Sequence, residues 1–426
     1  MFKPLDRSIN VGFISFRFHG TDGVSLETSK WAEVLEEMGH KCYYFSGQSD
    51  RPSDRSMVVE KAHFLDPEIR DYYTSFFSST RRTREETLWI HSRREFFKEH
   101  LYSFIEKFKL DLLIPQNLLS FPLNIPLSMA LVEIIAETNI PTIAHHHDFT
   151  WERKPLLVNS IWDYITMAVP PNLQSVQHVV INTSASHQMA RRVGVSSMII
   201  PNVMDFENPP PEPDEYSSDL REALGIEPDE LFILQPTRVV QRKGIEHAIE
   251  LVSRLGRKAR LVVSHASGDD GFEYEARVAE FAEQLGVRTI FSSERFSENR
   301  GTTEDGRKIY SLSDAYPHAD LVTYPSLIEG FGNAFLEALY YRKPIVVNNY
   351  SIYATDIRPK GFKVIEFDEY ITEQTVQDTL RILDDPEHQA ELCGFNYALA
   401  LRHFSYKVLR SQFKVMLANA FGINGE

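Results

Sequence analysis

Cysteine is scarce in this chain, and long apolar runs are missing from it. The 426 residues include only two cysteines, Cys42 and Cys393, one in each half and neither in a CxxC pair. A disulfide framework is therefore not expected, and a reducing compartment is favoured. No stretch reaches the roughly 18 apolar residues of a membrane-spanning helix, and no charged-then-apolar leader precedes the first expected strand. We expect a cytoplasmic protein.

An excess of positive charge is also lacking. Lysine and arginine number 45 against 60 aspartates and glutamates, which gives a formal net charge of -15. A nucleic-acid partner is not expected, because binding a phosphate backbone needs a positive surface that displaces counterions. With 42% apolar and 25% charged residues, the composition is that of a globular protein. The length favours two domains of about 200 residues each.

Short β-branched or aromatic runs alternate with helical patterns in both halves, which predicts an α/β protein with two doubly wound, parallel-sheet domains. The expected strands are residues 9–16, 42–45, 112–115, 142–145, 178–181 and 198–200 in the first half, and 232–235, 261–264, 289–291, 321–324, 345–348 and 364–367 in the second.

A proline-rich segment separates the two alternations. Four prolines between residues 209 and 213 favour a stiff, extended conformation, which we interpret as the interdomain linker. We therefore expect Rossmann-like domains at residues 1–208 and 209–405. A last helix, within residues 406–426, is expected to cross back to the first domain.

A basic turn directly follows the first strand of the second half. Residues 236–244 read PTRVVQRKG, with Arg238 and Lys243. A planar guanidinium that grips phosphate oxygens and a mobile ammonium would together suit a diphosphate. A solvated turn at a helix start is the alternative. Because positive charge there opposes the helix dipole, a bound anion would relieve the conflict.

The run at residues 325–349, PSLIEGFGNAFLEALYYRKPIVVNN, places Glu329 and Glu337 around Gly330 and Gly332. A strand, a glycine turn and a helix N-terminus present backbone N–H groups to an anion, while the carboxylates suit hydroxyls. A sugar nucleotide offers both phosphates and hydroxyls. An amphipathic helix with a capping glutamate would explain Glu337 but not Glu329 together with the two glycines.

Two loops of the first half also carry candidate residues. The loop at 19–24 contains Asp22 and Gly23, and it either brings the backbone close to a substrate or is an ordinary flexible connection. The strand at 142–145 ends in three histidines, residues 145–147, followed by Asp148 and Arg153. Alternation along a strand puts the first and third histidines on one side and the second on the other.

A metal site is not expected at these histidines, because zinc ligands usually occur at helical or CxxC spacing with a distant partner. A further basic stretch, residues 81–109, is interpreted as a solvated helix face, with an anionic acceptor or a membrane surface as alternatives.

Taken together, the basic turn, the E-x7-E pair, the glycine loop and the strand-end histidine resemble the family-four retaining glycosyltransferases of the GT-B fold, or glycosyl transferases group 1. The resemblance covers nearly the whole chain. It implies two Rossmann-like domains that face each other across a cleft, the first binding the acceptor and the second the nucleotide-sugar donor. The segments HHHDF-WER and YPSLIEGFGNAF are most similar to enzymes that make glycosylated glycerates and related compatible solutes.

The resemblance also implies a role for each candidate residue. The donor diphosphate would be bound by Arg238, Lys243, Gly330, Phe331 and Gly332, and the donor ribose by Glu337. The catalytic residues would be His147, beside the reacting carbon, Asp148, which reads the acceptor, and Glu329, which binds the transferred sugar. The acceptor loops would contain Asp22, Gly23 and Arg153. The chain departs from the family at residues 349–353, NYSIY, where a glycine-rich loop with another glutamate is common.

The implied activity is transfer of mannose or glucose, with retention, from a nucleotide sugar such as GDP-mannose or UDP-glucose to a small polar or anionic acceptor. No cofactor is required; Mg²⁺ is compatible with such a site but not necessary. A nucleotide-sugar-binding regulatory protein without activity, a transferase acting on lipid or polysaccharide at a membrane surface, and a glycoside hydrolase with paired carboxylates are the alternatives. Membrane association is not expected, and assembly into a homo-oligomer stays open.

Overall fold

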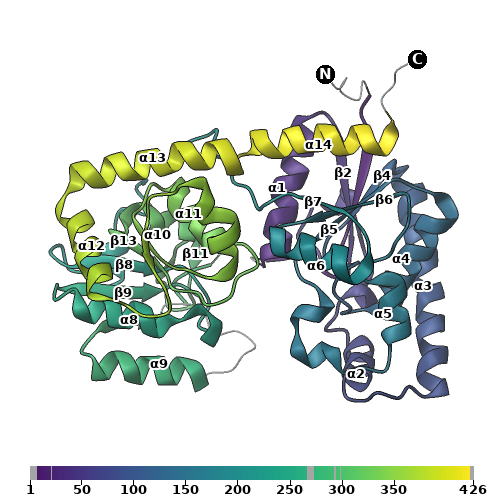
Figure 1. Ribbon diagram of the computed structural model, residues 1–426, viewed down its shortest axis with the longest axis horizontal. Coiled ribbons are helices and arrows are strands. Elements are labelled where there is room, and N and C mark those ends of the chain that lie inside the picture. Colours follow the sequence, from purple (N-terminus) through teal and green to yellow (C-terminus); the bar gives the residue numbers. More distant parts are fainter. Residues whose placement is uncertain (1–6, 21, 266–272, 292–293, 298, 423–426) are drawn as a thin grey trace. The chain divides into compact units, whose positions relative to one another are not determined.

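The structure is a computed structural model that describes residues 7–20, 22–265, 273–291, 294–297 and 299–422 (Figure 1). It divides into two compact units. Unit 1 comprises Met1–Val203 and Tyr406–Glu426, and unit 2 comprises Met204–Ser405. Among the described residues, no helix is both long and apolar enough to cross a membrane. Both cysteines are buried and free, Cys42 in unit 1 and Cys393 in unit 2.

In unit 1 the described residues form a seven-stranded sheet in the order β3-β2-β1-β4-β5-β6-β7, with every neighbouring pair parallel. The strands are β1 (Asn10–Ile14), β2 (Lys41–Ser46), β3 (Ser56–Val58), β4 (Leu112–Pro115), β5 (Thr142–His146), β6 (Val176–Val180) and β7 (Ser197–Ile199). All the predicted strands of the first half are present, and β3 is an additional edge strand.

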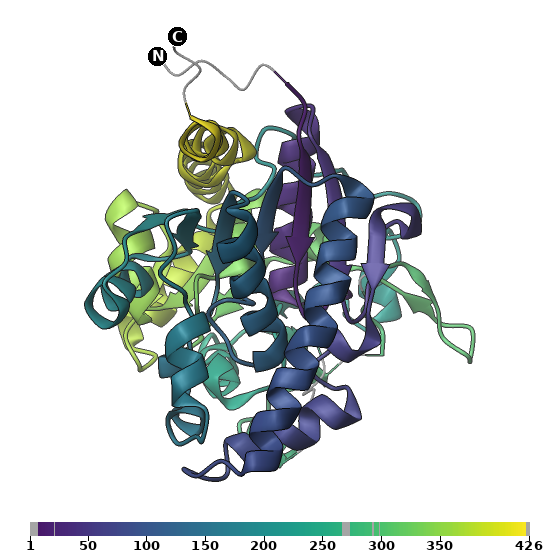
Figure 2. The same cartoon turned by 90° about the vertical axis from the view of Figure 1, so that its right-hand side faces the viewer.

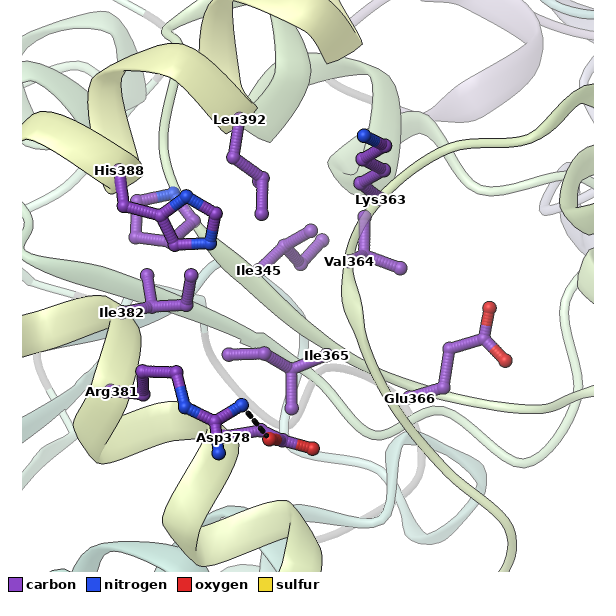
Figure 3. Close-up of a pocket in the computed structure, with 11 residues that line it drawn as sticks. Ile345, Lys363, Val364, Ile365, Glu366, Asp378, Arg381, Ile382, His388 and Leu392 are labelled. Carbon is purple, nitrogen blue, oxygen red and sulfur yellow. Dashed lines mark hydrogen bonds and ion pairs between the residues drawn. The ribbon is translucent and has the colours of Figure 1, made fainter.

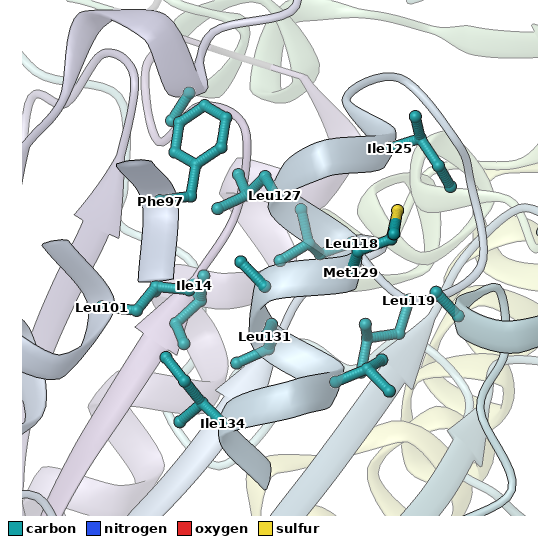
Figure 4. Close-up of a cluster of buried hydrophobic side chains, with 14 of the residues drawn as sticks. Ile14, Phe97, Leu101, Leu118, Leu119, Ile125, Leu127, Met129, Leu131 and Ile134 are labelled. Atoms are coloured by element: carbon teal, nitrogen blue, oxygen red, sulfur yellow. The ribbon is translucent and has the colours of Figure 1, made fainter. Parts of the chain in front are cut away.

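Helices cover both faces of this sheet, because successive side chains of each buried strand point to opposite faces. Val11 and Phe13 pack with α1 and α14, whereas Ile14 packs with α3 and α4 (Figure 4). The long blue helix of Figure 2 is α3. The helices are α1 (Gly23–Glu37), α2 (Pro67–Phe76), α3 (Arg84–Phe108), α4 (Ile125–Thr138), α5 (Trp162–Ala168), α6 (Thr183–Val193) and α14 (Tyr406–Phe421).

Unit 2 repeats the plan with six parallel strands among its described residues, in the order β10-β9-β8-β13-β14-β15. They are β8 (Leu231–Gln235), β9 (Ala259–Val263), β10 (Arg288–Phe291), β13 (Leu321–Tyr324), β14 (Ile345–Asn348) and β15 (Ile365–Phe367). A small antiparallel pair, β11 (Gly301–Thr302) and β12 (Lys308–Ile309), lies outside this sheet. The helices are α7 (Leu220–Ala223), α8 (Ile245–Arg254), α9 (Glu273–Gln284), α10 (Leu312–His318), α11 (Asn333–Tyr340), α12 (Glu373–Asp384) and α13 (Pro386–Phe404).

The chain passes from unit 1 to unit 2 five residues before the predicted boundary. Met204 already belongs to unit 2, where its N–H donates to the carbonyl of Phe404 at 2.8 Å. The buried ring of Phe206 meets Tyr340 and Tyr397 edge-on, and the hydroxyl of Tyr397 donates to the Phe206 carbonyl at 2.8 Å. These contacts fix residues 204–206 in unit 2. The proline-rich segment at 209–213 thus lies within unit 2 and is not the linker that its composition suggested.

The chain returns to unit 1 at Tyr406, and helix α14 packs there against α1. Phe413 meets the ring of Trp31 edge-on with centroids 5.0 Å apart, and the hydroxyl of Tyr406 donates to Glu33 at 2.9 Å. The last helix therefore completes one face of the unit 1 core.

Candidate functional site

The candidate residues for binding a nucleotide-sugar donor all follow strands that are neighbours in the sheet of unit 2. Strand β8 leads into the basic turn, β13 into the glycine turn, and β14 into residues 349–353. Because β8, β13 and β14 are adjacent and parallel, their carboxyl ends lie at one edge. The strand order reverses between β8 and β13, which is where doubly wound sheets bind ligands.

An ion pair joins the first two loops. Lys243 Nζ donates to Glu329 Oε1, and Arg242 Nη1 lies 3.5 Å from Glu329 Oε2. Lys243 is only 9% exposed. Burial alone would raise the pKa of Glu329, but the charges of Lys243 and Arg242 hold that pKa below its ordinary value. Burial lowers the pKa of Lys243, while Glu329 opposes the shift. Glu329 is therefore ionised at neutral pH.

The two loops also approach each other through their backbones. The Leu327 N–H donates to the Arg242 carbonyl at 2.8 Å. Gly244 has a φ of +60°, and a Cβ at this position would lie 2.5 Å from the Pro325 carbonyl oxygen. Only glycine fits so close an approach in that conformation.

Arg238 is exposed beside this pair. It makes no ion pair with any residue in the described part of the chain. Burial lowers the pKa of the neighbouring His265 to about 4, with Arg238 and Lys243 adding to the shift, so these basic groups lie within electrostatic reach of one another. A cation without a carboxylate partner is available to an anionic ligand here.

The glycine turn before α11 is closed by a tyrosine. Gly332, the N-cap residue of α11, has a φ of +134°. The hydroxyl of Tyr350 donates to the Phe331 carbonyl at 2.6 Å, and a Cβ on Gly332 would lie 2.5 Å from that hydroxyl. Tyr350 belongs to residues 349–353, where the chain departs from the family that it resembles. In this segment the tyrosine hydroxyl holds the glycine turn.

The two glutamates occupy different positions around this turn. Glu329 precedes it, and Glu337 lies in the second turn of α11, where it accepts a hydrogen bond from the hydroxyl of Tyr316 at 2.7 Å. Gly330 and Phe331 lie between Glu329 and the helix, and the Phe331 ring is buried. Unit 2 therefore brings Arg238, Lys243 and the glutamates to one edge.

In unit 1 the candidate residues follow strands β1 and β5, which lie on either side of β4 in the parallel sheet. Asp22 is the N-cap of α1, and its Oδ1 accepts hydrogen bonds from the Val24 and Ser25 N–H groups at 3.1 and 3.2 Å. Gly23 is the first helical residue, so it belongs to α1 and not to the preceding loop as expected. Thr21, in the same predicted loop, lies outside the described residues.

The three histidines have distinct surroundings. His145 stacks on Trp31 with centroids 4.0 Å apart, and His146 Nε2 lies 2.9 Å from His178 Nδ1, so both rings are packed in the core. His147 follows β5 and is partly exposed. Its ring lies 4.3 Å from that of His145, on the same side of the strand, as alternation predicted.

His147 is neutral at physiological pH. Burial lowers its pKa to about 4, and the charges of Asp148 and Asp22 oppose this shift only in part. Its Nε2 lies 3.2 Å from Gln116 Oε1, which also lies 2.9 Å from His145 Nδ1. With the Gln116 amide in this orientation, its oxygen accepts from both imidazole nitrogens, which leaves His147 Nδ1 unprotonated and able to accept a hydrogen bond.

The sequence interpretation missed Asn117, which holds the loop containing His147 and Asp148. Asn117 Oδ1 accepts hydrogen bonds from both of their backbone N–H groups, each at 3.0 Å, and from the Ser120 hydroxyl at 3.1 Å. It has a φ of +57°, a conformation that asparagine tolerates better than most residues. Gln116 and Asn117 directly follow apolar strand β4. Ligands of such sheets bind at the carboxyl ends of the strands, so the argument that singled out the loops after β1 and β5 would also have found these two residues.

Asp148 and Arg153 form an exposed ion pair, with Asp148 Oδ1 3.0 Å from Arg153 Nη2. The guanidinium also lies 6.0 Å from the ring centroid of Phe121. The two residues are thus close together at the same loop, and Asp148 does not stand alone as an open carboxylate.

The basic stretch at 81–109 is neutralised in part. Four of its eight arginines and lysines pair with acidic residues of neighbouring elements. These pairs are Arg82 with Asp163, Arg93 with Glu68, Arg94 with Glu133, and Lys98 with Glu133 and Glu137. The stretch is therefore a partly paired helix surface, and about half of the charge that suggested an anionic acceptor or a membrane surface is compensated.

A cavity of about 210 Å³ lies elsewhere in unit 2 (Figure 3). Its walls are mainly apolar side chains from β14, β15, α12 and α13, and Arg381 at the rim pairs with Asp378 at 2.8 Å. Because Ile345 and Ile365 begin their strands, the cavity lies at the amino ends of β14 and β15. It is thus at the opposite edge of the sheet from the candidate donor residues.

Within the described ranges, no group of three or more histidine, cysteine, aspartate or glutamate side chains is placed to hold a metal ion.

Comparison with known proteins gives a consistent result. The model of the family described as Glycosyl transferases group 1 matches residues 217–393. A mannosylglucosylglycerate synthase from Thermotoga maritima is 32% identical to this chain, over 94% of this chain and 98% of the synthase. A second mannosylglucosylglycerate synthase, from Petrotoga mobilis, is 30% identical to this chain, over 84% of this chain and 86% of that synthase.

Among solved structures, a sucrose-phosphate synthase from Thermosynechococcus elongatus superimposes with a TM-score of 0.68 at 16% sequence identity. The superposition covers 97% of this chain and 99% of that protein. At this identity the likeness concerns the fold.

The contact between Gly332 and Tyr350 yields a stability prediction. Gly332→Ala should destabilise unit 2 by about 2 kcal/mol or more, from backbone strain and the clash with the hydroxyl. Tyr350→Phe alone should cost about 1–2 kcal/mol, the loss of a buried hydrogen bond. Since Tyr350→Phe removes the clashing atom, the double variant should cost less than the sum. Urea unfolding measures all three variants.

The matched control is Gly394→Ala in the middle of α13, where a Cβ would meet no atom within 4 Å. It should stabilise the protein by up to about 1 kcal/mol, because alanine is the better helix former. Strict additivity of Gly332→Ala and Tyr350→Phe would contradict the proposed clash.

The buried histidines yield a pH prediction. Burial lowers the pKa of His178 from 6.5 to about 4. Between these values the unfolded chain binds a proton that the folded chain does not, so the free energy of unfolding falls as pH falls, by about 1.4 kcal/mol per pH unit for each such histidine. Unfolding in urea from pH 4.5 to 7.5 should show this slope. It should be shallower in His178→Gln and unchanged in His187→Gln, which alters an exposed histidine. Equal slopes in all three proteins would rule the explanation out.

Proposed function

The chain belongs to the glycosyl transferases group 1 family and has the GT-B fold, and from this premise we propose that it transfers a hexose from a nucleoside diphosphate sugar to a small acceptor of the glycerate type. The observation that carries the proposal is the arrangement at the carboxyl edge of β8 and β13. There, an exposed arginine without an ion-pair partner among the described residues lies beside a buried lysine and an ionised glutamate.

These residues suit the departure of a diphosphate. Negative charge builds on the phosphate oxygens as the bond to the sugar breaks, and Arg238 and Lys243 would stabilise it. Glu329, which Lys243 keeps ionised, would accept hydrogen bonds from sugar hydroxyls. Glu337, in α11, would bind the ribose. We propose that this charge stabilisation needs no metal ion and that the anomeric configuration is retained.

The state of Glu329 excludes it as the general acid of a glycoside hydrolase. Such an enzyme needs one carboxylic acid that is protonated at the start, with its pKa raised. The pKa of Glu329 is lowered by Lys243 and Arg242 despite its burial. It therefore lacks the property of a general acid.

The relatives suggest the first substrates to test. The two synthases are named for the product mannosylglucosylglycerate. We propose that this chain likewise transfers mannose to glucosylglycerate, with GDP-mannose as the first donor and UDP-glucose as the second. His147 and the pair of Asp148 with Arg153 would contact the reacting sugar and the acceptor.

The test is incubation of the purified chain with each donor, with and without glucosylglycerate. Mass spectrometry should show a product heavier by one hexose, together with release of the nucleoside diphosphate. Proton NMR should show the anomeric configuration of the donor in the product. Activity should persist in EDTA. Binding of a donor without any turnover would instead identify a nucleotide-sugar-binding protein without activity.

Removing the unpaired cation should weaken donor binding. Arg238→Met should raise the KM for the donor about 10- to 100-fold, because a charge-assisted contact to phosphate contributes roughly 1.5–3 kcal/mol. The KM for the acceptor should change little. Steady-state kinetics with each substrate varied in turn separates the two effects.

The matched control is Arg257→Met, which removes an exposed arginine of the same unit that pairs with Asp384 at 2.8 Å. It should leave both KM values unchanged. A donor KM that is the same in Arg238→Met as in the unmodified protein would remove Arg238 from the diphosphate site.

A further inference from the structure

Arg17 is a basic residue at the carboxyl end of β1 to which the proposed function assigns no role. It lies between the buried residues Phe16 and Phe18, and its own side chain is 31% exposed. The guanidinium carbon lies 5.5 Å from the ring centroid of Phe64, which stacks on His63 at 4.7 Å. An aromatic face fixes the position of the guanidinium while leaving its N–H donors available.

The charge of Arg17 is only weakly compensated. Its Nη2 lies 3.4 Å from Asp22 Oδ2, and within the described residues this is its one ion pair. That carboxylate is already engaged, since it caps two N–H groups of α1 and accepts the Ser25 hydroxyl at 2.5 Å. By contrast, Arg82 holds Asp163 through two hydrogen bonds of 2.7 Å. Arg17 thus keeps most of its hydrogen-bonding capacity.

His63 adds a second donor beside it. Its Nδ1 accepts a hydrogen bond from the Leu65 N–H at 3.0 Å, so the proton of the neutral ring is on Nε2. That nitrogen is buried without a hydrogen-bond partner in the described part of the chain. Burial lowers the pKa of His63, and the charges of Arg17 and His19 lower it further while Asp66 opposes the shift. Arg17 and His19 therefore lie within electrostatic reach of His63.

Arg17 and His63 lie near the imidazole of His147, which would face the reacting sugar in the proposed function. Strands β1, β4 and β5 are adjacent and parallel, so the residues after β1 and β5 lie at one edge of the sheet. Asp22, which pairs with Arg17, is close enough to His147 to act on its pKa. Arg17 is therefore within reach of a small molecule bound at His147.

We propose that Arg17, with His63, binds the carboxylate of the acceptor and makes the enzyme selective for anionic acceptors. The inference rests on the proposed function and adds to it the residues that recognise the acceptor's charge. A planar guanidinium matches a carboxylate through two parallel hydrogen bonds, and such a ligand would displace the weak contact with Asp22. A site built in this way rejects an uncharged analogue, which leaves its donors unpaired.

The experiment compares glucosylglycerate with glucosylglycerol, which has an alcohol in place of the carboxylate, as acceptors for the full-length protein. The unmodified protein should show a kcat/KM at least 10-fold higher for the anionic acceptor. Arg17→Met should raise the KM for glucosylglycerate about 10- to 100-fold and that for glucosylglycerol less than about 3-fold. Arg17→Lys should restore part of the loss, since it keeps the charge but not the planar fork. The donor KM and kcat should stay the same.

Arg55→Met is the matched control, because Arg55 is an arginine of the same unit whose charge is paired with Glu36 at 2.7 Å. It should leave both acceptor KM values unchanged. Equal losses for both acceptors in Arg17→Met, or a raised donor KM, would show that Arg17 only supports the loop and would overturn the inference. Turnover without preference between the two acceptors would overturn it as well while leaving the proposed function intact. Absence of turnover with every donor and acceptor would instead reject the proposed function.

Discussion

The buried ion pair between Lys243 and Glu329 is the constraint on which the edge of unit 2 depends. Removing two charges from water is expensive, and removing one partner of such a pair commonly costs about 3–5 kcal/mol. The pair therefore ties the loop after β8 to the loop after β13. Their backbones meet where the Leu327 N–H contacts the Arg242 carbonyl and where Gly244 lies against the Pro325 carbonyl. A ligand that binds Lys243 would consequently act on both loops.

The two units share one architecture, but the loops at the carboxyl ends of their strands differ in charge. Each has a parallel sheet whose strand order reverses beside the first strand, and each places its polar loops at the carboxyl ends of the strands around that point. In unit 2 the loops supply cations around one ionised glutamate. In unit 1 they supply neutral histidines, amides and the weakly paired Arg17. In the proposed reaction, the same backbone plan would offer charge stabilisation in one unit and recognition of hydroxyls and a carboxylate in the other.

Much of this arrangement follows from local sequence, and the rest depends on contacts that no local pattern reveals. Strands β13 and β14 have the predicted bounds, because both are short apolar runs buried on both faces. Strand β3 was missed because it is a three-residue edge strand, too short to show an alternating pattern. The unit boundary was misplaced because Phe206 is held by Tyr397, 191 residues away. Tyr350 acts on Phe331 in the same way, through a turn that only the folded chain brings near.

The neutral state of His147 limits what it can do in the proposed reaction. A group with a pKa of about 4 is a weak base at neutral pH, so it takes a proton from an acceptor hydroxyl only poorly. Its Nε2 proton is also committed to Gln116. What remains is Nδ1, an acceptor of hydrogen bonds held in place by the amides of Gln116 and Asn117. His147 is thus suited to orienting a hydroxyl of the sugar or acceptor. Removal of the hydroxyl proton falls to another group, and among the participants in the proposed reaction the departing diphosphate is the one that gains basicity as the bond breaks.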